Sequence, residues 1–416
     1  MRIKDQIDQA NSEAITRMID SDPVWLDVRP AIEVVPGMDK YKIFYAGPPV
    51  SWESMCKPQQ NAIIGAIIYE RLAEKPEEAV QAILDGRASI DSNHNHTSVN
   101  PMTGVMSASM PVFVVENRTY ENRAFCLLHE GMARHRLAVG NFDSRVLEHL
   151  QWIRETLAPV LRETILRIKG IKLKSIMAKA IAMGDELHNR SVAATCLLVR
   201  IIGSHMAGIG LPGRQVSEVL RFLEEDDHFF LALAMPAAKV AADAAHGIEN
   251  STLVTAMTRN GVEFGIRVSG LGSEWFTGPA QPIEGLYLPG YSAADAGYDM
   301  GDSSIMETVG LGGFAMAASP EMSLTAGGTP DQGVAWSKQM RHICTATNKE
   351  VRLPWVDFTG TPIGIDVRKV VETNILPVID TAIAHREGGL IGVGMVSPPM
   401  ACFKKALQAI AKAFDF

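Results

Sequence analysis

Residues 183–190, Met-Gly-Asp-Glu-Leu-His-Asn-Arg, form the densest polar run in a stretch that otherwise reads as helical. The glycine predicts the end of one helix, and Asp185 is a suitable cap for the next. A helix that starts there would place Glu186 and Arg190 on one face, four residues apart. His188 and Arg190 would then lie near a helix N-terminus, where unpaired N–H groups favour an anion. The alternative is a capped helix start with an internal Glu186–Arg190 pair and no ligand.

A second polar cluster, residues 92–98, separates a predicted helix from a predicted buried strand. The spacing of His94 and His96 would place two imidazoles on one face of an extended segment, which is compatible with a metal ion. The neighbouring sequence offers no obvious third ligand. A polar loop that contacts substrate through Asn93 and His96 is the other functional interpretation, and a solvated turn is the simplest one.

Two further stretches lie in the C-terminal part of the chain. Asn260-Gly261 stands between two strand-like runs, which is a strong hairpin signal. Arg259 and Asn260 would be well placed at a strand end to contact a ligand, although a plain turn explains Asn260 equally well.

The glycines of residues 301–315 allow a close approach to an anion. The spacing Gly310-x-Gly312-x-x-Ala315 only partly mimics a dinucleotide loop, because no clear strand precedes it. The N–H groups of Gly312 and Gly313 could form a nest for an oxyanion or a phosphate. Close helix packing is the structural alternative. The sequence contains no Walker A motif and no Gly-x-Ser-x-Gly elbow, so neither P-loop hydrolysis nor serine nucleophile chemistry is predicted.

The hydrophobic pattern predicts the elements that must position these groups. Residues 1–22 and 399–414 read as amphipathic helices, and 32–35 and 41–46 read as strands. Residues 338–346 and 366–385 are predicted to be helical. The predicted fold class is multidomain α/β: a Rossmann-like α/β part (1–140), a central helical domain (141–250) and a Gly-rich α/β domain (251–416).

Composition limits the class of protein. The 416 residues suffice for two or three domains, and the five cysteines contain no C-x-x-C pair, which indicates reduced thiols. A charged N-terminus without an apolar region, and no apolar run long enough to span a bilayer, predict a cytoplasmic protein that does not bind membranes. The net charge of -8 gives no general attraction to nucleic acid, so an anionic substrate would need a local basic site.

These motifs, in this order, resemble the AllG family, formerly a domain family of unknown function. The resemblance covers almost the whole chain and rests on residues 25–30, 46–49, 101–105, 183–190, 259–267, 301–317 and 364–368. Two positions depart from the family pattern: a glycine is expected where Asn100 stands, and an asparagine is expected where His129 stands. If those positions contact substrate, the chain is a paralogue with a changed substrate.

The resemblance implies a subunit of oxamate carbamoyltransferase in allantoin and purine catabolism. The implied reaction converts oxalurate plus phosphate to oxamate plus carbamoyl phosphate, without a cofactor or a metal. The implied partners are these small anions and the other subunits of the complex, one of which resembles an acyl-CoA synthetase. A homo-oligomer is also left open.

This chemistry suggests roles for the polar residues, and the resemblance itself supplies none of these roles. Phosphate and carboxylate suit guanidinium groups, and a donor is needed at the carbamoyl oxygen, which His188 or the Gly312–Gly313 amides would supply. A base such as Glu186 or Glu307 would activate the amide nitrogen. The predicted catalytic residues are His188, Arg190, Glu186 and Glu307. The predicted substrate-binding residues are Asn93, His96, Asn189, Arg259, Asn260, Arg267, Asp302, Gly312, Gly313 and Arg368.

Two alternatives belong to other classes of function. One is a metal-dependent amidohydrolase acting on a ureido substrate, built on His94, His96, His188 and Asp185. The other is a non-catalytic assembly subunit whose polar loops bind a partner.

Overall fold

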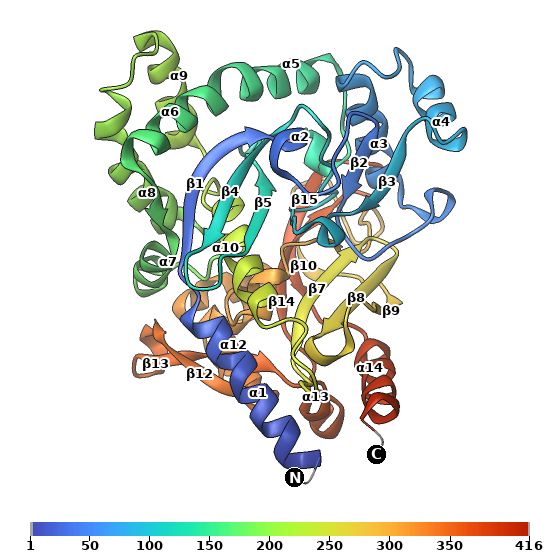
Figure 1. The fold of residues 1–416 in the computed structure, drawn as a ribbon, viewed down its shortest axis with the longest axis vertical. Helices are drawn as coiled ribbons and strands as arrows, with labels where there is room; N and C mark the ends of the chain where they lie inside the picture. Colours follow the sequence, from blue (N-terminus) through green and yellow to red (C-terminus); the bar gives the residue numbers. More distant parts are fainter. Residues whose placement is uncertain (1–2, 415–416) are drawn as a thin grey trace.

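The computed structural model describes residues 3–414 as a mixed α/β protein with several small sheets (Figure 1). The chain begins with helix α1 (Ile3–Asp20), as predicted. Its buried residues Ile7, Ala10, Ala14 and Met18 recur every three or four positions, which gives one apolar face. This face contributes to a small hydrophobic cluster with residues of the C-terminal half.

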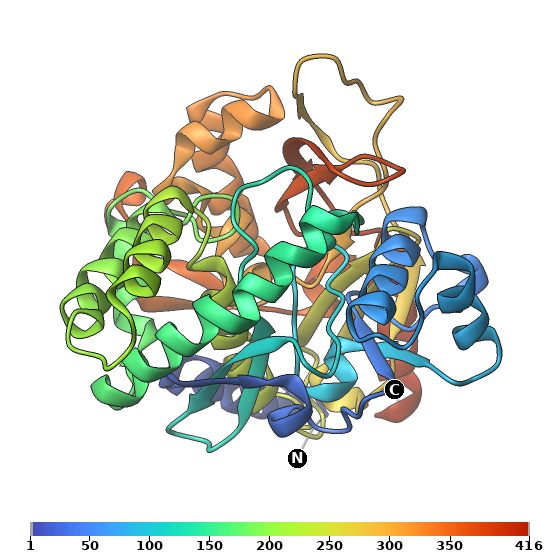
Figure 2. The same ribbon diagram turned by 90° about the horizontal axis from the view of Figure 1, so that it is seen from above.

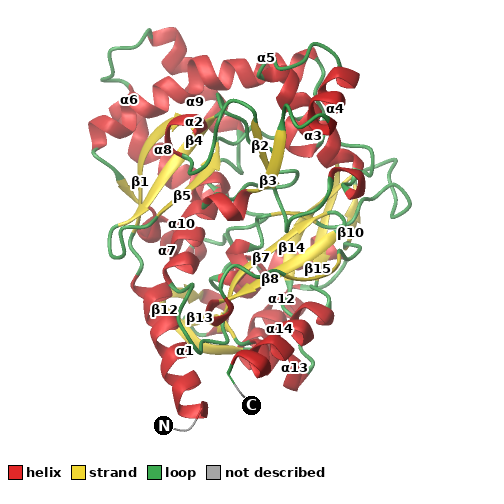
Figure 3. Ribbon diagram, turned by 45° about the vertical axis from the view of Figure 1, so that its right-hand side comes forward, coloured by secondary structure: helices red, strands yellow, loops and turns green. Residues whose placement is uncertain are grey.

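The first sheet joins the N-terminal part of the chain to the middle helices. Its strand order is β5-β4-β1-β6, and every pairing in it is antiparallel. Its strands are β1 (Pro23–Pro30), β4 (Pro111–Asn117), β5 (Arg123–Leu127) and β6 (Ile171–Lys172). Helix α10 (Leu231–Ala244) packs against β4 and β5, so one face of this sheet is covered by a helix (Figure 3).

The Rossmann-like arrangement predicted for residues 1–140 is not confirmed. Such a fold needs a mainly parallel sheet, whereas β1 and β4 run antiparallel. Among the named strands of residues 3–414, β2 (Lys42–Tyr45) and β3 (Ser89–Ser92) form the parallel pair, and an isolated parallel bridge joins Ser98 to Phe125. Strand β2, helices α3 and α4, and strand β4 follow one another along the chain, but β2 and β4 belong to different sheets. The order of these elements therefore does not produce one parallel sheet.

The helices between these strands follow the hydrophobic pattern, with one exception. Two of these helices are α3 (Lys57–Tyr69) and α4 (Pro76–Leu84). The predicted strand at 32–35 is wrong, because α2 (Ala31–Val34) occupies this stretch. Ala31 and Val35 are buried four residues apart, which is helical spacing.

The middle of the chain is helical, as predicted. Figure 2 shows its green helices on one side of the molecule and the blue helices α3 and α4 on the other. A π-helical turn at Ile153–Leu157 links α5 to α6 and accommodates Pro159. The helices are α5 (Ser144–Trp152), α6 (Ala158–Ile168), α7 (Leu173–Ala182), α8 (Val192–Met206), α9 (Gly213–Glu225) and α10.

The C-terminal part contains three small antiparallel sheets, with orders β11-β7-β8-β9, β10-β15-β14 and β12-β13. The strands are β7 (Val254–Asn260), β8 (Glu263–Val268), β9 (Phe276–Pro279), β10 (Glu284–Tyr287), β11 (Met300–Gly301), β12 (Cys344–Leu353), β13 (Thr359–Ile365), β14 (Ile379–Ala384) and β15 (Leu390–Val396). The helices are α11 (Ile305–Thr308), α12 (Pro330–Gln339), α13 (Val367–Thr373) and α14 (Met400–Ala413).

The predicted hairpin is confirmed, and two predicted helices are corrected. Strands β7 and β8 pair through Asn260-Gly261, with Gly261 at a φ of +80°. The helix predicted at 338–346 is wrong beyond 342, because α12 continues only as a 3-10 turn at Met340–His342 and strand β12 begins at Cys344. The helix predicted at 366–385 ends at Thr373, because Asn374 adopts a left-handed conformation. The chain then continues as strand β14.

One large hydrophobic cluster extends from Trp25 to Leu353, and a second one is formed by residues of the C-terminal half. The first cluster crosses both predicted domain boundaries, so the three-domain division stays a prediction. None of the helices within residues 3–414 is both long and apolar enough to cross a membrane.

Candidate functional site

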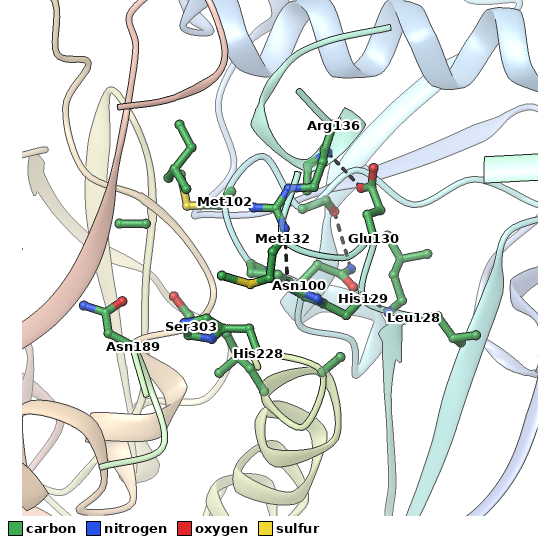
Figure 4. A pocket seen from close by; sticks show the side chains of 18 of the residues that line it. Asn100, Met102, Leu128, His129, Glu130, Met132, Arg136, Asn189, His228 and Ser303 are labelled. Atoms are coloured by element: carbon green, nitrogen blue, oxygen red, sulfur yellow. Dashed lines mark hydrogen bonds between the residues drawn. The ribbon is translucent and has the colours of Figure 1, made fainter. Parts of the chain in front are cut away.

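A cavity of about 140 Å³ lies where segments from residues 100 to 393 meet (Figure 4). Its walls come from residues 100–105, the long loop at 127–138, residues 188–189, the start of α10, and strands β14 and β15. Apolar side chains such as Met102, Leu128 and Leu231 form much of the wall. Polar groups converge on it from several elements, which is typical of a small-molecule site.

Arg136 is the cation of this cavity. Its side chain is buried, its Nη1 donates to the carbonyl of Gly131, and its Nε has no hydrogen-bond partner among residues 3–414. Burial lowers the pKa of Arg136, and the carboxylates of Glu130 and Asp226 counteract this effect. A guanidinium remains charged at any physiological pH, so the cavity contains a fixed positive charge with a free donor.

Two histidines lie beside this guanidinium. His129 Nδ1 is 2.6 Å from Asp226 Oδ2, and His129 Nε2 is 3.5 Å from Arg136 Nη1. The other oxygen of Asp226 accepts the backbone N–H of His228. Burial and the nearby His129 lower the pKa of His228 to about 4, so its imidazole is neutral at pH 7. Asp226 therefore orients the imidazole of His129 and holds the backbone of His228 at the cavity wall.

His188 joins the cavity to a buried group of acids behind it. Its Nδ1 lies 2.7 Å from Glu307 Oε1 and 3.3 Å from Asp380 Oδ1. Glu186 is also buried and accepts the backbone N–H of His188 at 2.6 Å. Asp380 and the cavity residue Ala382 are two positions apart on β14, so both point to the same face of that strand.

Burial controls the protonation of this acidic group. It lowers the pKa of His188 to about 4 and raises the pKa of Glu307 to about 7. Burial and the neighbouring Glu307 raise the pKa of Asp380 to about 7, and burial and Asp380 raise the pKa of Glu186 well above its usual range. The group therefore resists carrying three negative charges at once.

The loop that carries His188 is held by hydrogen bonds from its own acids. Residues 184–191 are irregular, and α8 begins only at Val192. The Asp185 carboxylate accepts the backbone N–H groups of Ala193 at 3.2 Å and Ala194 at 2.8 Å. Asp185 thus caps α8, although it lies seven residues before Val192, the first residue of that helix. These hydrogen bonds fix the loop relative to the helix.

Replacement of Asp185 by alanine is expected to destabilise the protein by about 1–2 kcal/mol, because the first turn of α8 loses its acceptor. Urea unfolding of the variant, monitored by circular dichroism, measures this change. Asp331→Ala, in the exposed first turn of α12, is the matched control. An unchanged free energy of unfolding in Asp185→Ala would contradict the capping role.

Comparison with known proteins identifies the family of this chain. A profile described as "Oxamate carbamoyltransferase subunit AllG" matches residues 88–303. The Escherichia coli K12 protein "Oxamate carbamoyltransferase subunit AllG" is 42% identical over 410 residues, covering 97% of this chain and 98% of that protein. The chain belongs to the AllG family. The family resemblance read from the sequence is therefore confirmed.

Two other relatives of this AllG-family chain carry no assigned function. "Uncharacterized protein YahG" of Escherichia coli K12 is 44% identical over 407 residues, which cover 97% of this chain and 86% of that protein. A crystal structure of a conserved protein of unknown function from Enterococcus faecalis V583 is 45% identical. It superposes with a TM-score of 0.97 over 99% of both chains.

The structure brings together several residues that the AllG-like motifs had singled out. His188, Glu186 and Glu307 form the buried acidic group, and Asn189 lines the cavity with an Nδ2 that has no partner in the described chain. Asn100 and His129, the two departures from the family pattern, both line the cavity. These residues remain predicted site residues.

Arg190 has a different environment from the one predicted. Its Nη1 lies 3.0 Å from Glu321 Oε1 and its Nε lies 3.7 Å from Asp185 Oδ1, outside the lining of the cavity. The predicted Glu186–Arg190 helix face is wrong, because residues 184–191 are not helical. Glu186 instead accepts the backbone N–H of Arg190.

Arg259 and Asp302 are fully buried and do not line the cavity. Arg259 is fully buried and donates to Asp299, to the carbonyl of Gly301, and to Ser303 and Thr381. Asp302 accepts from the amides of Gly47 and Asn100 and from the side chains of Asn93 and Thr258. Asn260 bonds to the carbonyl of Pro48 and to its own turn. These predicted binding residues are engaged by protein groups.

The remaining predicted contacts lie elsewhere. Arg368 pairs with Asp366 at 2.7 Å and with Asp8 at 3.7 Å, beside the N-terminal helix. Arg267 stacks on Trp275 and bonds to Asn95.

The other corrections concern the histidine pair and the glycine nest. His96 stacks on Phe44 and contacts Asp91, whereas His94 lies 3.6 Å from Asp302, so the two imidazoles have different neighbours and do not share a ligand. The hydrolase site built on His94, His96, His188 and Asp185 is therefore not formed. The N–H of Gly312 donates to the Glu186 carbonyl and that of Gly313 to Glu307, so neither is free for an oxyanion.

Three groups of the site were missed by sequence reasoning. Asp380 lies in the run Val-Ile-Asp-Thr-Ala-Ile, and an acid in a β-branched stretch is a signal for a buried functional group. Arg136 ends a short basic run, Arg-His-Arg, in an otherwise acidic protein. His228 follows two aspartates and carries no signal that distinguishes it from a surface turn.

Proposed function

We propose that this chain is a subunit of a carbamoyltransferase that interconverts oxalurate plus phosphate and oxamate plus carbamoyl phosphate. The name of the 42% identical relative supports the reaction class. The observation that carries the proposal is the buried Arg136, with an unpartnered Nε, in a small cavity of an acidic protein. A buried guanidinium with a free donor suits a carboxylate or a phosphate.

The other polar groups of the cavity complement an amide-bearing anion. Asn189 Nδ2 is a buried donor without a protein partner, and buried donors are rarely left unpaired in native proteins. His129 Nε2 lies on the side of Arg136, whereas the side chain of Asn100 is engaged by Leu127 and Gly104. Glu130 also lines the cavity, but its carboxylate accepts the backbone N–H groups of Leu137 and Ala138. Oxamate and oxalurate each carry one carboxylate and neighbouring amide groups, which suits one fixed cation with an amide side chain opposite it.

His188 is the proposed donor to the carbamoyl oxygen. When phosphate attacks the carbamoyl carbon of oxalurate, negative charge develops on that oxygen before the bond to the oxamate nitrogen breaks. His188 Nδ1 faces Glu307, which leaves Nε2 as the ring nitrogen for the cavity side. A neutral imidazole donates from Nε2 only when Nδ1 carries no proton, so this role requires a protonated Glu307 that donates to Nδ1. Burial raises the pKa of Glu307 to about 7, which allows that protonation. One such donor contributes roughly 10²–10³ in kcat.

The same reaction assigns partners to the chain. The proposed partners are the small anions and the other carbamoyltransferase subunits, including the one that resembles an acyl-CoA synthetase. The structure supports neither the role of Arg190 as a direct anion contact nor the two alternative functions.

Phosphate-dependent cleavage of oxalurate tests this function. We expect the chain, combined with the other subunits of the oxamate carbamoyltransferase, to form carbamoyl phosphate and oxamate in equal amounts from oxalurate and phosphate. The assay follows both products with and without the chain. Cleavage that yields no carbamoyl phosphate, or turnover that persists when the chain is omitted, would contradict the proposal.

A further inference from the structure

The acidic group behind His188 lacks a compensating cation. Within residues 3–414, the one basic side chain within 4 Å of the carboxylates of Glu307 and Asp380 is the imidazole of His188, and no lysine or arginine lies that close. Arg259 is the guanidinium that influences Glu307 from a greater distance, and its nitrogens are occupied by Asp299, Ser303 and Thr381. Buried carboxylates without a paired charge are costly, so a proton or a metal ion must accompany them.

Several oxygens of this group have no donor. Both carboxylate oxygens of Asp380 and the Oε2 of Glu307 are buried, and no N–H or hydroxyl group of residues 3–414 donates a hydrogen bond to them. The polar neighbours of Asp380 besides His188 are the carboxyl groups of Glu186 and Glu307. Asp299 and Asp302, two other buried carboxylates, accept from Arg259 and from four donors respectively. Among the described residues, the buried carboxylate oxygens that lack such a donor therefore belong to Glu307 and Asp380.

The backbone is shaped to bring these carboxylates together. Gly312 has a φ of +58°, and a Cβ at this position would lie 2.0 Å from Glu307 Oε1 and 3.0 Å from Asp380 Oδ1. Any other residue would therefore displace the carboxylate of Glu307. Gly313 adds its N–H to Glu307 Oε1 at 3.0 Å, which fixes the orientation of that carboxylate. Orientation of a ligand by a second hydrogen bond is typical of metal sites.

We propose that His188, Glu307 and Asp380 form a site for a divalent metal ion, with Glu186 beside it. One ligand atom from each of the three residues lies within 4.8 Å of the others. Two ligands bound to one ion at about 2.1 Å and at right angles are about 3.0 Å apart. The distances of 2.7 and 3.3 Å from His188 Nδ1 to the two carboxylates bracket this value.

The ligand set indicates which ions the site would take. One imidazole with carboxylate oxygens and no thiolate favours Mn²⁺ or Zn²⁺, whereas Ca²⁺ prefers six or more oxygens. The ion would bind Nδ1 of His188 and leave Nε2 directed to the cavity, so it is compatible with the donor role of His188. The metal site rests on the geometry alone and does not depend on the proposed reaction.

Binding of Mn²⁺ to the metal-stripped full chain tests the site, with electron paramagnetic resonance to count bound and free ion. We expect about one Mn²⁺ per chain, displaced by Zn²⁺. Asp380→Asn keeps the side-chain shape and removes one ligand, and it is expected to weaken Mn²⁺ binding at least 100-fold. Asp366→Asn changes a buried carboxylate at the other end of the protein and should leave Mn²⁺ binding unchanged.

A second measurement separates loss of a ligand from loss of the fold. Without metal, Asp380→Asn should unfold at the same temperature as the parent chain or a higher one, because an unpaired buried carboxylate is removed. Added Mn²⁺ should raise the unfolding temperature of the parent chain only. The metal site is overturned if the parent chain binds neither Mn²⁺ nor Zn²⁺ at millimolar concentration, or if Asp380→Asn binds Mn²⁺ as tightly as the parent. Both readouts are independent of oxalurate turnover.

Discussion

Arg136→Lys is expected to lower kcat/KM for oxalurate about 100-fold. Lysine keeps the charge but replaces the planar fork of Arg136 by a single ammonium group on a flexible stem. The guanidinium is buried in the cavity, so its replacement would leave part of the substrate carboxylate without a hydrogen-bond donor. Loss of one partner of a buried charged pair typically costs about 2–5 kcal/mol of binding free energy. Steady-state kinetics of the reconstituted complex at varied oxalurate concentration measure this loss.

Arg134→Lys is the matched control for this variant. Arg134 lies two residues upstream in the same loop, is exposed, and does not line the cavity. The same chemical change at Arg134 should leave kcat/KM within about twofold of the parent. Equal kinetics in the Arg136 and Arg134 variants would show that the cavity is not the oxalurate site.

His188→Ala is expected to lower kcat by about 10²–10³ while KM for oxalurate changes much less. The imidazole is proposed to donate a hydrogen bond to the carbamoyl oxygen as negative charge develops there. An interaction made mainly in the transition state affects kcat rather than substrate binding. His205→Ala, on helix α8 and away from the cavity, is the control for loss of an imidazole.

The division between kcat and KM distinguishes this role from a structural one. A His188→Ala variant that retains kcat but loses affinity would make His188 a binding residue and not a donor in the transition state. A variant that binds oxalurate and turns it over like the parent would remove His188 from the reaction.

Part of the site was predictable from residue types alone. His188, Glu186, Asn189 and Glu307 belong to polar stretches that have no reason to exist in a purely structural core, and such violations mark functional sites. The prediction could not specify how Glu186 is used, because a cap and a short hydrogen-bonded loop need the same residue types. The structure shows that Glu186 accepts backbone N–H groups within its own loop.

The missed residues depend on long-range contacts. Asp380 was hidden in a stretch predicted as helix up to residue 385, and its position on β14 is fixed by pairing with β15. Arg136 lies in an irregular loop, where no periodicity indicates which of three neighbouring basic residues points inward.

The arginines show the converse error. Arg190, Arg259 and Arg368 were predicted to bind anions, but each is paired with an aspartate or a glutamate of the chain. A guanidinium in a motif is equally suited to a ligand and to an internal carboxylate, and only the fold determines which one it meets. Single helices and strands were predicted more reliably than the pairing of the strands, because periodicity along the chain is local and strand pairing is not.

Titration calorimetry of oxamate tests the central claim most directly, which is that the Arg136 cavity binds a small amide-bearing anion. The chain is used in whichever assembly supports turnover, and oxamate is titrated into the parent and into Arg136→Lys. The cavity predicts one oxamate per chain in the parent and at least tenfold weaker binding in Arg136→Lys. Equal affinity of the parent and the variant for oxamate, or no binding to either, would contradict it.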